Sequence, residues 1–233
     1  MTSHRWLLTL TAVGLLAGAG CAIHDLGPAR TTEKSVDAGS AESVRAEIRM
    51  GAGELRLGGG AKKVLEAKFR TNLEAPEVRY DVSAGRGRLV VDQPGNARGS
   101  NIENDWDLKL GNGQPLELTV NLGAGQSEMD FTEVNLRSLD VNMGVGELKL
   151  DLRGNYKRDL DVRVRGGVGQ ATIRLPGKIG VRVDARGGIG GISTHNLKQR
   201  GRDYYNEAYE DAKVRMRVEV RGGVGQISLI GEE

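Results

Sequence analysis

A glycine-any-glycine step recurs seven times in one sequence context along this chain, and it limits the possible folds more strongly than any other feature. The steps lie at residues 51–53, 85–87, 123–125, 144–146, 167–169, 188–190 and 223–225. Three central intervals are 21, 23 and 21 residues long, and the other intervals are 34, 38 and 35 residues long. A period of about 20 residues is typical of stacked units that cannot bury a core alone. The longer intervals indicate loops inserted between such units.

Alternating apolar and polar residues flank the glycine steps. The positions three and five residues before the first glycine are almost all apolar, and the residue between them is mostly polar, as in Val218-Glu219-Val220. After the step, positions four and six are again mostly apolar, as in Leu148 and Leu150. This period of two is typical of a half-buried strand. We therefore expect each unit to contain a strand, a glycine bend and a second strand.

The same residue type recurs at the same offset in most units, which favours parallel stacking. In a parallel solenoid, equivalent positions lie about 4.8 Å apart, so that a column of valines buries itself. Glycine suits the bend because a Cβ atom would obstruct a positive φ or the close approach of neighbouring units. The sequence therefore predicts an all-β protein, a parallel β-solenoid of about seven Gly-x-Gly rungs over residues 44–233. A β-sandwich is the competing architecture.

The first 21 residues have the features of a lipoprotein signal. Basic residues His4 and Arg5 precede a run of about 14 mostly apolar residues, which is too short to span a bilayer but suits a secretory signal peptide. The run ends in Ala17-Gly18-Ala19-Gly20-Cys21, which resembles the lipobox of bacterial lipoproteins. We predict a signal peptide over 1–20, lipidation of Cys21, and a flexible tether over 21–43.

This start of the chain predicts export and anchoring in a membrane of the cell envelope. Ala22 carries no inner-membrane aspartate signal, so we expect the outer membrane, facing the periplasm or the surface, if the cell has two membranes. Cys21 is the only cysteine, which excludes an intramolecular disulfide and a Cys-based zinc site. The balance of 33 basic and 31 acidic residues gives no electrostatic case for nucleic acid.

Several segments together resemble one known family. They are residues 106–110, 115–125, 165–169, 205–206 and 222–227. These motifs are similar to the toast-rack domains, which resemble the C-terminal domain of LiaF-like cell-wall-active antibiotic response proteins and candidate β-helical adhesins. The similarity covers about residues 44 to 230. The resemblance implies a β-helix-like stack and an envelope location, and it supplies no catalytic residue.

Arginine recurs two residues before the glycine step in the last three units, at Arg165, Arg186 and Arg221. Stacked guanidinium groups about 5 Å apart repel each other unless acidic groups pair with them. Such acidic groups lie one outward position away, at Asp140, Asp184 and Glu219. Two interpretations stay open: a charge-compensated, solvated face, or a cationic strip that binds an anionic envelope polymer or lipid headgroup.

The segment 195–213 interrupts the repeat and carries three of the five tyrosines, Tyr204, Tyr205 and Tyr209. Tyrosines on a loop form good contact surfaces, because a rigid apolar ring carries a polar tip. Alternatively, the segment folds back and its rings cover one side of the stack. We expect a helical turn within it.

The chain offers little material for catalysis. Beyond the signal its histidines are His24 and His195, which excludes a His-centred relay within the repeats. The Asn and Asp residues between 101 and 107 match no calcium-loop spacing. We therefore predict a protein without enzymatic activity, metal or cofactor that serves in binding, adhesion or scaffolding. Its expected partners are the membrane, through Cys21, and an anionic envelope polymer or another envelope protein.

Two other functions remain as alternatives. The resemblance to LiaF-like proteins implies a regulatory domain in an envelope-stress response. Some β-helices are carbohydrate-active enzymes that use a pair of carboxylates, but the acidic residues here recur at repeat offsets, which structural patterning explains.

Overall fold

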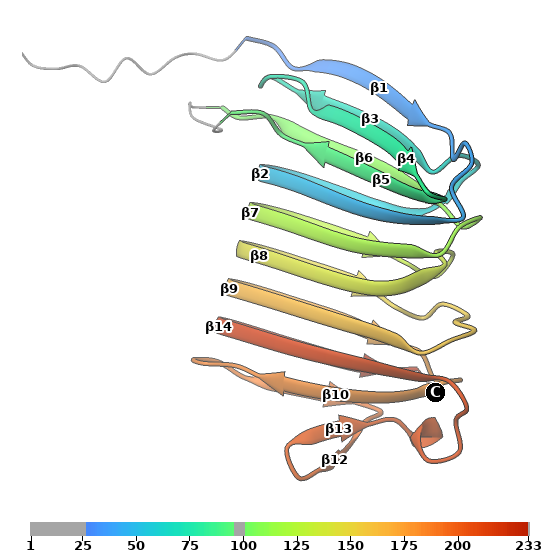
Figure 1. Cartoon of the computed structure of the whole chain (residues 1–233). Helices are drawn as coiled ribbons and strands as arrows, with labels where there is room; N and C mark the ends of the chain where they lie inside the picture. Colours follow the sequence, from blue (N-terminus) through green and yellow to red (C-terminus); the bar gives the residue numbers. More distant parts are fainter. Residues whose placement is uncertain (1–26, 96–100, 233) are drawn as a thin grey trace, which may run out of the picture.

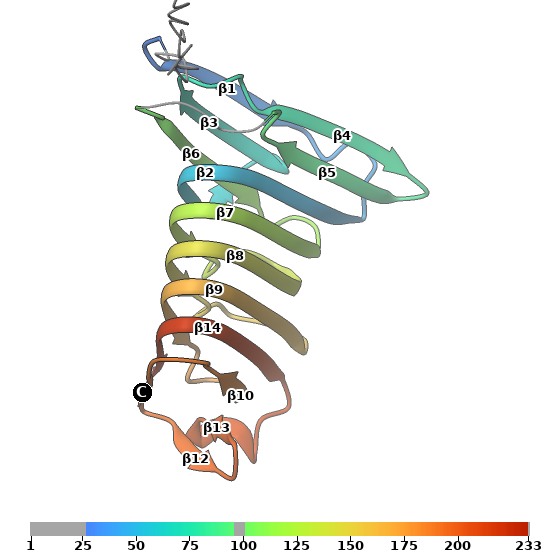
Figure 2. The same ribbon diagram turned by 90° about the vertical axis from the view of Figure 1, so that its left-hand side faces the viewer.

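Five long strands, each bent near its middle, form the frame of the molecule. The computed structural model describes residues 27–95 and 101–232, and its fourteen strands form one continuous sheet. Each long strand folds at a glycine step into two arms (Figures 1 and 2). The long strands are β2 (Ser43–Ala61), β7 (Leu116–Asp130), β8 (Leu136–Asp151), β9 (Leu160–Leu175) and β14 (Arg215–Gly231).

Shorter strands extend each arm at both ends of the stack. The halves before the bend continue into β5 and β4 at one end, and into β10, β13 and β12 at the other. The halves after the bend continue into β6, β3 and β1 at one end, and into β11 at the other. These strands are β1 (Arg30–Val36), β3 (Leu65–Thr71), β4 (Glu77–Ser83), β5 (Arg86–Asp92), β6 (Asn104–Gly111), β10 (Gly180–Arg186), β11 (Ile192–His195), β12 (Lys198–Arg200) and β13 (Asp203–Tyr205).

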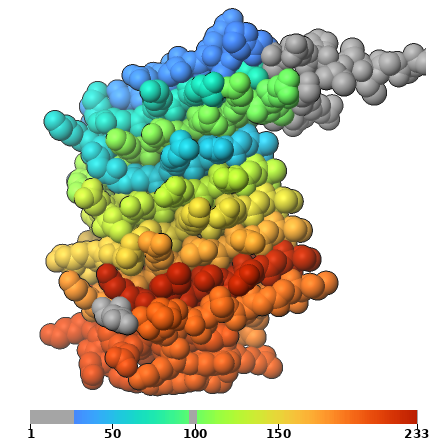
Figure 3. Space-filling view, turned by 180° about the vertical axis from the view of Figure 1, so that it is seen from behind, coloured from blue at the N-terminus to red at the C-terminus, as the bar shows by residue number. Residues whose placement is uncertain are grey.

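Parallel pairing in register joins the long strands. Gly53 pairs with Gly125, Gly125 with Gly146, and the series continues through Gly169 to Gly225. The spatial order differs from the chain order at one place, because β14 inserts between β9 and β10. In the space-filling view the red β14 layer lies between layers formed by earlier parts of the chain (Figure 3).

One glycine step does not belong to the stack, so the prediction of seven rungs is wrong at residues 85–87. Ala84 and Gly85 form a two-residue turn with φ values of 49° and 72°, and this turn joins β4 and β5 as an antiparallel hairpin. Two successive positive φ angles are the geometry of a tight hairpin turn. Six steps stack instead, and the sheet is open and bent, not a closed coil.

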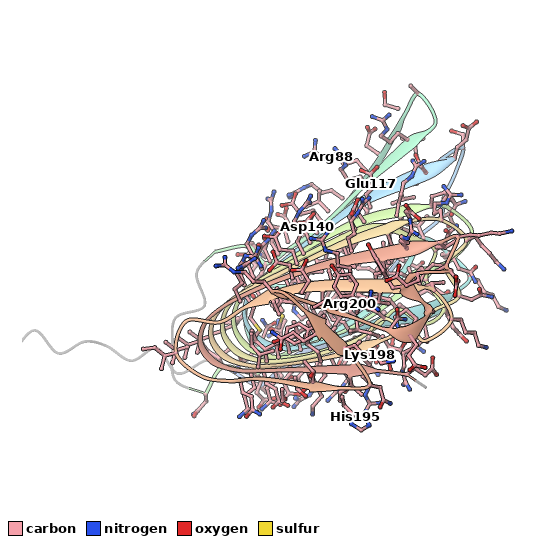
Figure 4. All side chains as sticks on the ribbon, turned by 90° about the horizontal axis from the view of Figure 1, so that it is seen from below. Arg88, Glu117, Asp140, His195, Lys198 and Arg200 are labelled. Atoms are coloured by element: carbon pink, nitrogen blue, oxygen red, sulfur yellow. The ribbon has the colours of Figure 1, made fainter. Side chains whose placement is uncertain are left out.

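The hydrophobic core lies between the two arms. The residues three positions before each stacked step face inward and are at most 7% exposed, as the alternation predicts. The arms therefore pack like two layers of a sandwich, although both belong to the same strands (Figure 4). The inward residues are Ile48, Val120, Val141, Val164, Val220 and Ala185. Phe69 and Trp106, in edge-to-face contact at 5.2 Å, fill the core toward β1.

The predicted tether over 21–43 is too long, because Arg30–Val36 forms strand β1. This strand pairs antiparallel with β3 along its whole length, and Val36 packs against the core. Six of its seven residues are not aliphatic or aromatic, so no hydrophobic period reveals it; its backbone pairs with an edge of the sheet that would otherwise be open. Cys21 and the predicted signal peptide lie outside the described residues.

The insertions between the long strands contain short elements of their own. Strand β3 follows the first long strand. The helical turn expected in the segment 195–213 is confirmed as a 3₁₀ turn, η1 (Glu207–Tyr209). No helix in the described part of the chain is long and apolar enough to cross a membrane.

Candidate functional site

The outer edge of the bend carries a column of exposed apolar side chains. The middle residues of the stacked steps are neighbours across the sheet, in the order Ala52, Ala124, Val145, Val168, Val224 and Ile189. The last four are 53%, 49%, 46% and 74% exposed, respectively. We call Val145, Val168, Val224 and Ile189 the bend ridge.

The glycines of each step place these side chains outward. Gly146 has a φ of 143°, and a Cβ atom on it would lie 1.8 Å from the carbonyl oxygen of Gly125 in the neighbouring strand. Gly169 meets Gly146 in the same way, also at 1.8 Å. No side chain fits at these contacts, so every stacked step requires glycine there. A Cβ on the first glycine of the other five stacked steps, from Gly123 to Gly223, would also lie within 2.4 Å of a neighbouring carbonyl oxygen, so the middle residue is the one position of those steps at which side-chain chemistry can vary.

The end of the bend nearest β6 is closed by two amide side chains. Gln93 accepts a hydrogen bond from the backbone N–H of Gly51 at 3.0 Å. Asn104 donates to the carbonyl oxygen of Ala52 at 2.6 Å and to Gln93 Oε1 at 3.0 Å, and it accepts from Trp106 Nε1 at 2.9 Å. Asn104, among the residues weighed for calcium, therefore has a structural role that satisfies backbone groups at the start of the stack.

The three candidate arginines are brought together beside the bend ridge. Arg165 pairs in register with Arg221, and Arg221 with Arg186, so their side chains leave the same face of adjacent strands. Asp184 lies between two of them: Arg221 Nη2 is 2.9 Å and Arg186 Nη2 is 3.2 Å from its Oδ2. Arg165 is held more loosely, with Nη1 4.0 Å from Asp140 Oδ1.

These ion pairs compensate part of the arginine charge. Partial burial acts to raise the pKa of Asp184, but hydrogen bonds and charge from Arg221 and Arg186 outweigh it, and the pKa lies below its ordinary value. Glu219 adds a second contact to Arg221 at 3.2 Å. The residues two positions before each stacked step nevertheless form a column, beside the ridge, of arginines and amides only. Their order is Arg49, Asn121, Asn142, Arg165, Arg221 and Arg186.

The opposite rim of the ridge changes its chemistry along the stack. The column that follows the step consists of Glu54, Gln126, Glu147, Gln170 and Gln226. Glu54 in β2 is beside Asp105 of β6, so this rim is acidic at one end. Along β9 and β14 it is formed by neutral amides. The arginines and two of the ridge residues, Val168 and Val224, thus lie where the second rim is uncharged, whereas Val145 lies two residues before the acidic Glu147.

The three candidate tyrosines lie apart from the ridge, on the edge that closes the stack. Tyr204 packs against the core, and the rings of Tyr205 and Tyr209 meet edge to face at 4.7 Å. The guanidinium groups of Arg200 and Arg215 lie 5.6 and 5.4 Å from the centres of these two rings. The segment covers the edge of β10 through β13, and the rings of Tyr205 and Tyr209 are partly buried.

Sequence reasoning missed the bend ridge. It treated the middle residue of the step as arbitrary, although this residue is alanine in β2 and β7 and a branched aliphatic in the last four stacked steps. A branched aliphatic at an outward position was the available signal.

The residue before the step also changes along the stack: Met50, Leu122 and Met143 are followed in register by Gly166 and Gly222. An apolar cavity beneath the ridge results, lined by Met143, Leu148, Val164, Val220 and Ile227.

Within residues 27–95 and 101–232, no three His, Cys, Asp or Glu side chains come together in a group that could hold a metal ion.

A stack of parallel strands, each folded at a glycine step, defines a class of bent-sheet repeat protein. The chain belongs to the toast_rack family: the model of the family's N-terminal domain, DUF2154, matches residues 25–174. The family resemblance inferred from the sequence is therefore confirmed.

A solved structure of a "putative cell adhesion protein" from Clostridium sporogenes is similar over its whole length. The two chains are 34% identical, the match covers 88% of this chain and 100% of that chain, and the TM-score is 0.85. A "putative adhesin" from Bacteroides fragilis is 10% identical, with 86% of this chain and 96% of that chain covered, but its TM-score of 0.30 supports no conclusion. No curated protein matches the chain.

Proposed function

We propose that this protein is a non-enzymatic lipoprotein of the cell envelope whose rigid bent sheet binds or adheres to a partner. The observation that carries the proposal is the likeness to the Clostridium sporogenes protein, at 34% identity over all of that chain. The name of that protein assigns it to cell adhesion, which also favours an envelope location here. The argument is one of analogy, because function resides in sites and not in folds.

The physical form of the sheet supports the same proposal. Cross-strand pairing holds the long strands in one register, so side chains on the outer faces stand in columns about 4.8 Å apart. The outer faces of the two arms point in opposite directions, as Glu117 and Asp140 on one arm and His195 on the other show (Figure 4). Like groups at fixed spacing suit an extended partner better than a small reactant.

Lipidation of Cys21 is tested by metabolic labelling with radioactive palmitate in a bacterium that processes lipoproteins. The wild-type chain is expected to incorporate label and to fractionate with membranes, and C21A is expected to do neither. An unlabelled wild-type chain would reject the anchor.

Adhesion is tested in the native organism by comparing attachment of wild-type cells with that of cells lacking the gene. We expect attachment to fall on deletion and to return with the wild-type chain but not with C21A, which would be exported without an anchor. Equal attachment of wild-type and deletion cells to host matrix, to each other and to abiotic surfaces would reject the adhesive role.

A further inference from the structure

We propose that the bend ridge docks on an anionic phospholipid bilayer, so that the sheet lies along the membrane on its bent edge. Val145, Val168, Val224 and Ile189 would enter the headgroup region, while Arg165, Arg186 and Arg221 face lipid phosphates. The inference rests on the proposed envelope lipoprotein and adds the orientation of the domain and the lipid chemistry that it recognises.

The first observation is the continuity of the apolar surface. The four residues of the ridge are each about half exposed or more, and they are consecutive neighbours across β8, β9, β14 and the 188–190 step. Single exposed aliphatic residues need no explanation, whereas a contiguous row with polar rims marks a contact surface. At one rung per about 4.8 Å, the row is roughly 15 Å long.

The second observation is the shape of this surface. The row lies on the outside of the bend, where the strands fold back (Figures 2 and 4). Small-molecule sites are concave, whereas a narrow convex edge presents its side chains together to a soft, planar interface. Valine and isoleucine at this edge have their apolar atoms directed away from the core, where a bilayer can bury them.

Charge complementarity is the third observation. Arg165, Arg221 and Arg186 form one column immediately beside the ridge, and their side chains are 52%, 35% and 44% exposed. Along β9 and β14 the facing rim carries Gln170 and Gln226, which do not repel phosphate, and its one acidic residue beside the ridge is Glu147 in β8. Basic residues beside an inserted apolar row are attracted to anionic lipids, and guanidinium groups bind phosphate through two parallel hydrogen bonds.

The place at which the chain enters the sheet is the fourth observation. Arg30 begins β1 and pairs with Thr71, Thr71 pairs with Asn104, and Asn104 lies against Gly53 at the bend. The chain therefore enters at the same edge that carries the ridge (Figure 1). Eight residues lie between Cys21 and Arg30, and the nine residue steps that join them reach at most ~30 Å. A lipid on Cys21 and the ridge would thus face the same membrane.

The test uses the chain from Ala22 onward, which retains every described contact and lacks the lipidated cysteine. It is sedimented with vesicles of phosphatidylcholine alone or of phosphatidylcholine with phosphatidylglycerol. We expect binding to the anionic vesicles and little to the neutral ones. The variant V145T/V168T/V224T/I189T keeps the β-branched shape and is expected to lose at least tenfold in affinity.

Matched charge variants test the arginine column. R186Q/R221Q and R182Q/R217Q remove two positive charges each from the same strands, β10 and β14, but the second pair lies four residues, about 13 Å, farther from the step. R186Q/R221Q is expected to weaken anionic binding at least fivefold, and R182Q/R217Q by less than twofold. D184N releases Arg186 and Arg221 and is expected to strengthen binding about fivefold, a gain that loss of folding cannot produce.

Three results would overturn the proposal: no binding to anionic vesicles, equal losses for the two arginine pairs, or full binding by the threonine variant. Retention on an anionic polysaccharide that requires the arginines but not the ridge would assign the site to a polymer instead. Failure of palmitate labelling would reject the anchor while leaving vesicle binding by the ridge measurable, so the two failures are distinguishable.

Discussion

The bend has two halves that share a backbone and differ in side chains. In β2 and β7 the middle residue of the step is alanine. The residue directly before the step, Met50 or Leu122, fills the inner side of the bend, and acidic Glu54 lies on one rim. In β9 and β14 the middle residue of the step is valine, and the residue directly before the step is glycine, Gly166 or Gly222. Both rims there lack acidic residues. The glycines at the close contacts are common to both halves, so they set the shape, and the variable positions set the surface.

The largest expected effect tests whether both halves need glycine equally. A Cβ on Gly125 would lie 1.9 Å from the Gly53 carbonyl oxygen, and one on Gly169 would lie 1.8 Å from that of Gly146. Each of G125A and G169A is expected to cost more than about 4 kcal/mol of unfolding free energy, because a backbone clash adds to an unfavourable φ. Urea unfolding followed by circular dichroism measures both.

A control for these variants lies in the same strand. Gly166 has open space where a Cβ would be added, so G166A should leave stability unchanged or raise it by up to about 1 kcal/mol. An unchanged unfolding free energy in G169A would contradict the distinction between glycines that set the shape of the bend and positions that can vary.

The next effect compares two valines of β8 on opposite sides of the sheet. Val141 is 1% exposed in the core, and Val145 is 53% exposed on the ridge. V141A is expected to lower the unfolding free energy by about 2 kcal/mol through lost burial and a cavity, while V145A changes it by less than about 0.5 kcal/mol. Similar losses in both variants would mean that the ridge serves stability rather than binding.

A smaller effect is expected from filling the cavity in the β9 half. Met143 occupies the inner side of the bend one rung away from Gly166, so G166M introduces the side chain that the neighbouring strand already uses. We expect a gain of about 1 kcal/mol, from cavity filling and from the loss of glycine flexibility in the unfolded chain. A destabilised G166M would indicate that the cavity is too narrow for this side chain.

The smallest effect concerns pH. The pKa of Asp184 is lowered in the folded state, so its contribution to stability is complete above the unfolded-state value of about 3.9. That contribution is lost as the pH falls through the lower, folded-state pKa. D184N is expected to flatten the acid side of the stability profile between pH 4 and pH 2 relative to wild type. Urea midpoints measured across that range give the difference, and parallel profiles would contradict the role of this ion pair.

Much of the frame could be predicted from the sequence because a parallel stack repeats residue types at fixed offsets. The inward valines and the adjacency of Arg165, Arg221 and Arg186 both follow from register. The hairpin at Gly85 could not be separated from a rung, since its local sequence also alternates and also bends at glycine. Strand β1 stayed hidden because a polar edge strand depends on backbone pairing and not on apolar residues.

The candidate site was predicted only in part, for a related reason. Register placed the arginines, but how their charge is shared depends on side-chain conformations, such as the approach of both Arg186 and Arg221 to Asp184. The position of Ile189 beside Val224 could not be read from chain order, since the strand that contains Val224 is inserted out of turn.

That insertion has a consequence for how the protein is made. Strand β10 leaves the ribosome before β14, yet β14 is its long-strand neighbour and separates it from β9. A nascent chain that ends before Arg215 holds two exposed edges with no bridge between them. The stack is therefore completed only when β14, the last long strand to be synthesised, pairs with both β9 and β10. Pairings between strands that are far apart in the sequence are slow to form.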